Sequence, residues 1–118
     1  MKQIKLYCDR YGKVTVDNPN VLLDGEIGAV DVVVSMAGLG LTSYYKRVEF
    51  LVGNDKSVKY LPLTNTTGDS FTITLTDEHL KRGYLRVQPI AILEVDGVVT
   101  EKIKWEVIEL KVKFSVNF

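Results

Sequence analysis

The chain has 118 residues, of which 46% are hydrophobic and 25% are charged. This is enough apolar surface for one folded domain with its own core, and it excludes a disordered chain. The 15 Lys and Arg residues balance the 15 Asp and Glu residues, so the chain lacks the cationic surplus that binding to nucleic acid requires. We therefore expect no nucleic-acid partner.

Cysteine content and hydropathy restrict the class of protein further. Cys8 is the only cysteine, so no internal disulfide can form. The N-terminal lysines are not followed by the apolar core of a signal peptide, and no stretch approaches the roughly 20 apolar residues that span a bilayer. We expect a protein that is made in a cytoplasm and does not insert into a membrane.

Alternation of apolar and polar residues predicts β-strands through the first half of the chain. A further strand over 58–63 is predicted to lie at a sheet edge, because Pro62 has no backbone N–H to donate. The apolar members of the other strands are Ile4, Leu6 and Cys8; Val14 and Val16; Val30, Val32, Val34 and Met36; and Val48, Phe50 and Val52.

The segment 37–45 is rich in glycine yet apolar for a loop. It contains Leu39 and Leu41 and ends at the consecutive pair Tyr44 and Tyr45. Apolar and aromatic side chains on a surface loop mark contacts with partners. These four residues are therefore candidate interface residues.

The segment 70–84 combines a strand, a turn and a structural marker. Residues 70–76 alternate Ser or Thr with Phe71, Ile73 and Leu75, as in a half-buried strand. Residues 77–83 begin with acids, end with bases and close on Gly83, which predicts one short helical turn capped by Asp77. Tyr84 then starts a strand, as the tyrosine corner of immunoglobulin-like sandwiches does.

Asp96-Gly97 lies between two apolar runs and is a strong signal for a β-hairpin. It is predicted to join strands 84–94 and 98–107. The apolar face of the first strand changes from Leu85 and Val87 to Ile90 and Ile92, which predicts a bulge near Pro89.

The C-terminal strand changes face between Val107 and Ile108. Such a parity flip indicates a bulge, a bend or a crossing to another sheet. Residues 108–118 are therefore predicted as a separable extension strand whose apolar face contacts a neighbouring molecule. The candidate interface residues on it are Leu110, Val112, Phe114, Val116 and Phe118.

About nine short strands separated by turns predict one all-β domain over 1–118. We expect an immunoglobulin-like antiparallel β-sandwich with one short helical turn, and an irregular β-barrel is the alternative.

Residues capable of chemistry are few. His79 is the only histidine and is expected at the surface of the helical turn. Cys8 alternates with Ile4 and Leu6 and is expected to be buried, as is Trp105. One histidine and one cysteine cannot form a zinc site of the usual spacing. We therefore expect no catalytic residue, no metal site and no cofactor.

Several segments together resemble the N-terminal domain of baseplate upper proteins from phages of Gram-positive bacteria. They lie between Val30 and Val107, although longer members of that family continue into further domains whereas this chain ends at Phe118. The matching segments are Tyr45-Lys46-Arg47-Val48-Glu49-Phe50, Ser70-Phe71-Thr72-Ile73-Thr74-Leu75, Leu80-Lys81-Arg82-Gly83-Tyr84-Leu85-Arg86-Val87-Gln88-Pro89 and Asp96-Gly97.

The resemblance implies a β-sandwich in the virion tail or baseplate, synthesised in the cytoplasm of a bacterial host. It implies contacts with other phage structural proteins, in a homo-oligomer or a hetero-assembly, and no catalysis. The alternative function is a carbohydrate-binding or adhesin module, which would need exposed aromatic side chains. Exposure of Trp105, Tyr44 and Tyr60 distinguishes the two functions.

Overall fold

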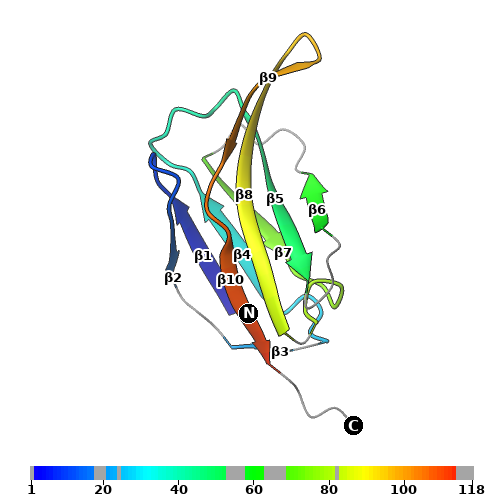
Figure 1. Cartoon of the computed structure of the whole chain (residues 1–118). Coiled ribbons are helices and arrows are strands. Elements are labelled where there is room, and N and C mark those ends of the chain that lie inside the picture. Colours follow the sequence, from blue (N-terminus) through cyan, green and yellow to red (C-terminus); the bar gives the residue numbers. More distant parts are fainter. Residues whose placement is uncertain are drawn as a thin grey trace.

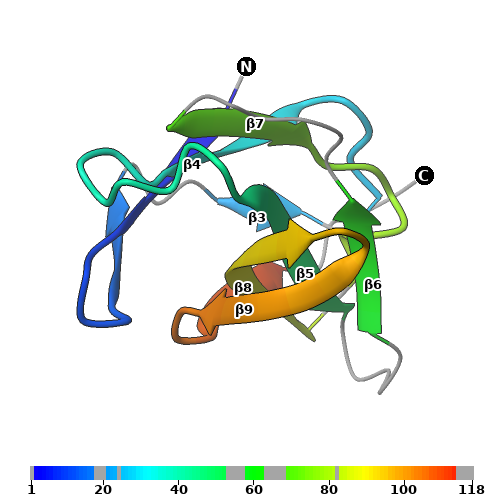
Figure 2. The ribbon, with the colours of Figure 1, turned by 90° about the horizontal axis from the view of Figure 1, so that it is seen from above.

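The computed structural model describes residues 2–17, 21–23, 25–52, 58–62, 69–81 and 83–113, with only the backbone described for 58–62. Two β-sheets pack face to face as a β-sandwich (Figure 1), and the view from above separates the two layers (Figure 2). These residues contain no helix. The predicted all-β sandwich is confirmed.

Each sheet has strands from both halves of the chain. Sheet A has the order β2-β1-β4-β7, and sheet B has the order β3-β10-β8-β5-β6, with β9 also paired to β8. The strands are β1 (Lys2–Cys8), β2 (Val14–Asp17), β3 (Leu22–Leu23), β4 (Val30–Ser35), β5 (Tyr45–Val52), β6 (Val58–Pro62), β7 (Ser70–Thr74), β8 (Gly83–Val95), β9 (Val98–Lys104) and β10 (Ile108–Lys113).

The core lies between the sheets and is formed by the apolar rows that the sequence predicts. In β4 the side chains of Val30, Val32 and Val34 are completely buried, and the residues between them are partly exposed. The same alternation orients β1, β5 and β7, because neighbouring residues of a strand point to opposite faces. One hydrophobic cluster joins both sheets.

The strand order from β4 onward is that of an immunoglobulin-like sandwich. β4 pairs with β7 in one sheet, whereas β10, β8 and β5 pair in the other, with β6 at the edge beside β5. The sequence predicts antiparallel sheets, but two of the strand pairs are parallel. β1 runs parallel to β4, and β3 runs parallel to β10.

The long strand β8 organises sheet B. Its 13 residues pair with β5 along one edge, and with β10 and then β9 along the other. The predicted bulge near Pro89 is wrong for β8 itself, because its register with β5 continues through the pair Val48 and Pro89. The Pro89 carbonyl accepts a hydrogen bond from the Trp105 N–H at 3.1 Å. The nitrogen of Pro89, which carries no hydrogen, therefore lies on the edge of β8 where the pairing with the next strand is interrupted.

The interruption lies at Trp105–Val107, between β9 and β10. Ile90 pairs with Lys104 and Val87 pairs with Ile108, so two residues of β8 face three residues of the interruption. One extra residue turns the following strand over, which explains the parity flip as a bulge within one sheet.

The prediction of a separable strand is wrong for residues 108–113. They form β10, which lies between β8 and β3 in the sheet of the chain itself. Val112 is 1% exposed and Leu110 packs against the same core. The remaining three predicted interface residues of this strand lie outside the described residues; they are Phe114, Val116 and Phe118.

The interruption also connects the two sheets. The Trp105 side chain is 3% exposed, and its Nε1–H donates to the Asp9 carbonyl at 2.7 Å. The Glu106 N–H donates to the Gly12 carbonyl at 2.8 Å, and the Glu106 carboxylate accepts a hydrogen bond from the Val14 N–H at 3.1 Å. Three hydrogen bonds thus hold the β1–β2 hairpin of sheet A against sheet B.

The two predicted turns have different outcomes. Asp96 and Gly97 have φ angles of 53° and 79° between β8 and β9. This confirms the Asp-Gly hairpin, and both positive angles suit a type I′ turn. Residues 77–79 form a single turn whose cap is Thr76 instead of Asp77, because the Thr76 hydroxyl accepts a hydrogen bond from the Glu78 N–H at 3.3 Å.

Replacement of Trp105 tests the connection between the sheets. Trp105→Phe removes the Nε1 donor and leaves the Asp9 carbonyl without it, which we expect to lower the free energy of unfolding by about 2 kcal/mol. Trp105→Ala also leaves a cavity and should cost about 4 kcal/mol. Urea denaturation followed by far-UV circular dichroism measures both.

The neighbouring Val107 provides a control, since its side chain is about half exposed. Val107→Ala should change the free energy of unfolding by less than about 0.5 kcal/mol. If Trp105→Phe cost no more than Val107→Ala, the hydrogen bond to Asp9 would not hold the sheets together.

Candidate functional site

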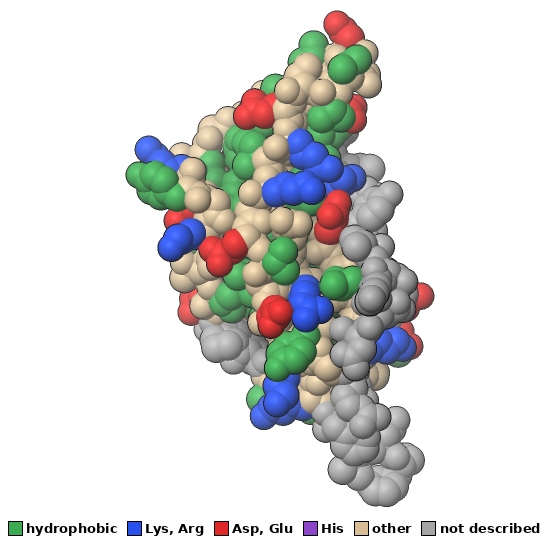
Figure 3. Space-filling view, in the orientation of Figure 1, with side chains coloured by type: hydrophobic (Ala, Val, Ile, Leu, Met, Phe, Trp, Pro, Cys, Tyr) green, Lys and Arg blue, Asp and Glu red, His purple; other side chains and the backbone are tan. Residues whose placement is uncertain are grey.

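The hairpin of β8 and β9 projects beyond the packed sheets (Figure 1) and ends in exposed apolar side chains. Val95, Val98 and Val99 are 50%, 62% and 51% exposed. Hydrophobic side chains are visible at this projecting end in the space-filling view (Figure 3). An apolar group that the fold does not cover is available to a partner.

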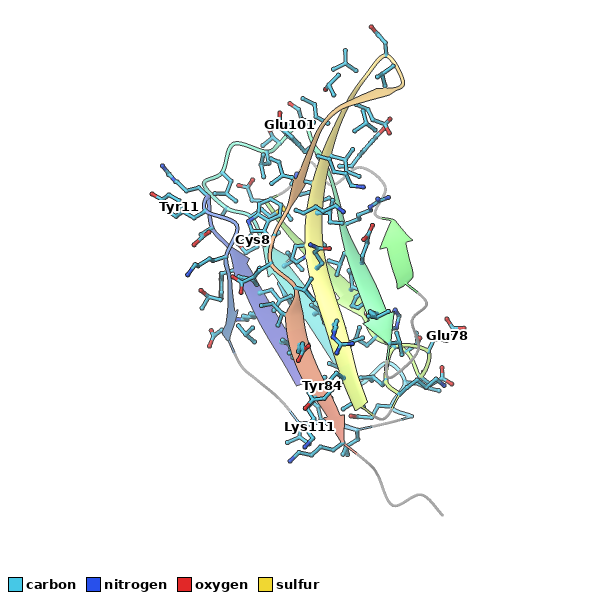
Figure 4. All side chains as sticks on the ribbon, viewed as in Figure 1. Cys8, Tyr11, Glu78, Tyr84, Glu101 and Lys111 are labelled. Atoms are coloured by element: carbon cyan, nitrogen blue, oxygen red, sulfur yellow. The ribbon has the colours of Figure 1, made fainter. Side chains whose placement is uncertain are left out.

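Two tyrosines brace the base of this hairpin. The Tyr44 hydroxyl donates to the Glu101 carboxylate at 2.6 Å, and the Tyr45 hydroxyl donates to the Glu94 carboxylate at 3.1 Å. Glu101 lies on the β9 side of the hairpin (Figure 4). Each hydrogen bond to a carboxylate raises the pKa of its tyrosine. The strand β5 and the preceding loop thus hold the hairpin from below its tip.

A buried lysine fixes that loop. Lys46 is fully buried, and its ammonium donates to the Leu41 carbonyl at 2.7 Å and to the Tyr44 carbonyl at 3.2 Å. Burial lowers the pKa of Lys46, and the negative charge of Asp69 offsets part of this decrease. The two carbonyl contacts provide the polar partners that a buried ammonium needs.

The four apolar loop residues that are predicted as an interface differ in their exposure. Leu41 is buried, whereas Leu39 is partly buried against the core. Tyr44 is half-buried and Tyr45 is exposed, and both brace the hairpin. Of the four residues predicted here as an interface, only Tyr45 is exposed to solvent rather than buried or partly buried.

A hollow of about 200 Å³ opens on the outer face of sheet B, away from the hairpin tip. Arg86 forms an ion pair with Glu109 at 3.0 Å, and Arg47 forms one with Glu49 at 3.3 Å. The described residues that line the hollow include no Ser, Cys or His, so they offer binding contacts without a nucleophile. They are Glu49, Phe50, Leu51, Arg86, Gln88 and Val107.

The single histidine is structural. His79 was expected at the surface, but it is 4% exposed. Its Nδ1 accepts a hydrogen bond from the Thr76 N–H at 3.1 Å, and its ring contacts Phe50 edge-on at a centroid distance of 4.8 Å. The burial of His79, its hydrogen bond within the 76–80 turn and its contact with Phe50 indicate that the side chain stabilises this turn.

The remaining predicted residues occupy separate places. Cys8 and Trp105 are buried, as predicted. Tyr84 is the second residue of β8 and pairs with Lys111, near the end of the molecule away from the hairpin (Figure 4), and it is 43% exposed. In a tyrosine corner the hydroxyl also bonds to upstream backbone, and for Tyr84 this contact stays a prediction. In the part of the chain that the structure describes, no three His, Cys, Asp or Glu residues gather as a metal site.

The apolar hairpin tip was missed in the sequence, although a signal for it exists. Val98 and Val99 are consecutive, so in a strand they point to opposite faces and cannot both enter one core. Val95 faces Val98 across the turn. Apolar residues on both faces of a hairpin end indicate that the hairpin leaves the sandwich.

Comparisons with known proteins add no relative. Neither the scan against protein-family models nor the search of curated proteins found a match. No helix in the described ranges is long and apolar enough to cross a membrane.

The Cys8 thiol provides a test of the buried chemistry. Burial, together with the negative charge of Asp9, raises the pKa of Cys8 to about 12. Because the thiolate is the reactive form, we expect Ellman's reagent at pH 8 to label the native protein about a thousandfold more slowly than the protein in urea. Equal rates would show that the thiol is accessible.

The same shift predicts a dependence of stability on pH. The unfolded thiol ionises near its ordinary pKa of 9.0, whereas the folded thiol keeps its proton to about 12. The stabilisation is complete below pH 9 and is lost as the pH rises toward 12. Cys8→Ala should remove this part of the decrease in unfolding free energy, as measured by urea denaturation at several pH values.

Proposed function

We propose that this chain is a non-catalytic assembly module of a phage tail or baseplate, and that it binds a protein partner through the β8–β9 hairpin. The observation that carries the proposal is the apolar tip formed by Val95, Val98 and Val99, each at least half exposed. Burial of the exposed part of each valine would contribute about 1 kcal/mol to binding.

The hairpin is suited to this role because it is held in place before a partner arrives. Asp96 and Gly97 have the positive φ angles that a type I′ turn requires, and the Tyr44 and Tyr45 hydroxyls hold the strands below the turn. A binding element that is ordered in advance loses little conformational entropy on binding.

The assignment to a phage tail or baseplate rests on the sequence resemblance. Its segments lie on β5, on β7, on the first part of β8 and at the β8–β9 turn, and only the last of these belongs to the projecting hairpin. Of the three aromatic residues that distinguish a sugar-binding module, the side chain of Tyr60 lies outside the described part of the chain. Exposed tyrosines occur elsewhere, at Tyr7, Tyr11, Tyr45 and Tyr84. Trp105 is buried in the core, and the Tyr44 hydroxyl is engaged by Glu101.

The test begins with the genes beside the one that encodes this chain. Tail-fibre, tape-measure or lysis genes are expected there. The chain is then produced together with the neighbouring tail proteins, and complexes are separated by size exclusion. We expect one of these proteins to elute with the chain, and Val98→Asp with Val99→Asp to abolish that complex.

Val21→Asp is the matched control, because Val21 is 53% exposed and lies outside the hairpin. It should leave the complex intact. Neighbouring genes with no virion protein among them, or a complex that survives the paired hairpin substitutions, would contradict the proposal.

A further inference from the structure

We propose that the hairpin tip of one copy docks into the hollow on the outer face of sheet B of a second copy. The partner is thus another molecule of the same chain, which deepens the proposed function and rests on it. The contact is heterologous, since it joins two different surfaces of the two copies.

The tip offers an apolar end with a negative charge at its apex. Val95 and Val98 face each other across the turn, and Asp96 is exposed between them. The turn holds the backbone of Asp96 at the apex of the hairpin, at a φ of 53°.

The lining of the hollow combines apolar side chains with Arg86 and with Glu49, whose carboxylate is paired with Arg47. Leu51 and Val107 provide apolar contact, and Val107 is about half exposed. Arg86 lies in the same lining and is 38% exposed. Cationic side chains are also visible above the middle of this face (Figure 3).

Arg86 has capacity left for a second carboxylate. Its Nε donates to Glu109 at 3.0 Å, in an ion pair whose two side chains are substantially exposed. An exposed pair of this kind is weak. A guanidinium carries five N–H donors in a planar fork, so the other donors can reach Asp96 of an incoming tip.

The hairpin tip of one copy cannot reach the hollow of the same copy. Arg86 and Asp96 lie ten residues apart along the same extended strand, or about 33 Å at the usual rise per residue. The tip therefore reaches the hollow of another molecule only. A single contact leaves a free tip on one copy and a free hollow on the other, so further contacts close a ring of two or more copies or extend a linear array.

The contact should be weak in isolation. A hairpin tip buries much less than the roughly 1,200 Å² of a standard stable interface. The formal net charge of zero means that copies do not repel each other strongly. We expect association that increases with concentration from the micromolar to the millimolar range.

Complementation between two variants of the full chain tests the proposal. The tip variant Val98→Asp keeps the hollow, and the hollow variant Arg86→Glu keeps the tip. Sedimentation velocity measures the mass of each. We expect each variant alone to self-associate at least about tenfold more weakly than the unchanged chain.

Mixing the two variants should restore one contact, between the tip of the Arg86→Glu copy and the hollow of the Val98→Asp copy. The mixture should therefore form a one-to-one dimer that does not grow further. Val107→Asp serves as a second hollow variant, and Val21→Asp is the control that should associate like the unchanged chain. Circular dichroism checks that every variant is folded.

Two results would overturn the inference. An unchanged chain that stays monomeric at millimolar concentration would do so, and so would an Arg86→Glu variant that self-associates normally, since that result indicates contact between two tips. Neither result bears on binding to a different tail protein, which the co-elution experiment with neighbouring gene products measures separately.

Discussion

Three residues, Trp105–Val107, allow the last strand to turn over while it stays on the same edge of β8. Ile103 in β9 packs against the core on an odd position, whereas Ile108 and Leu110 in β10 do so on even positions. Without the extra residue, Glu109 and Lys111 would face the core instead, because a shift of one residue exchanges the two faces of a strand. The place of β10 in sheet B, and of β3 beside it, depends on this interruption.

The interruption also divides β8 into two parts with different roles. The first part pairs with β10 and belongs to the sandwich, whereas the last part pairs with β9 and continues into the projecting hairpin. The side chain of Trp105 fills the junction and its Nε1–H bonds to sheet A. The same device that closes the core therefore positions the hairpin that we propose as the binding element.

Much of the fold could be predicted because strand alternation is a local property of the sequence. The rows at Val30–Met36 and Val48–Val52 need no knowledge of their partners to be read as half-buried strands. The Asp96-Gly97 turn is equally local, since its backbone angles favour those residue types. These predictions are confirmed by the strand bounds and burial.

The incorrect or missing predictions concern contacts that the sequence pattern of a single strand does not show. The parity flip at Val107 was seen, but only the pairing of Ile108 with Val87 shows that β10 stays in the same sheet. Alternation places Lys46 on the inward face of β5 with Val48 and Phe50, but it does not show that the ammonium donates to the Leu41 carbonyl. The burial of His79 likewise depends on its contact with Phe50 of β5, 29 positions away.

Amide hydrogen exchange at Trp105 and Glu106 tests the central role of the interruption most directly. Their N–H groups donate to Pro89 and Gly12, respectively. If this segment closes the sandwich, both amides should exchange only on global unfolding, as slowly as the amide of Val87 in the middle of β8. Exchange at the rate of an open turn, with Val87 still protected, would show that the sandwich closes without the interruption and would contradict this account.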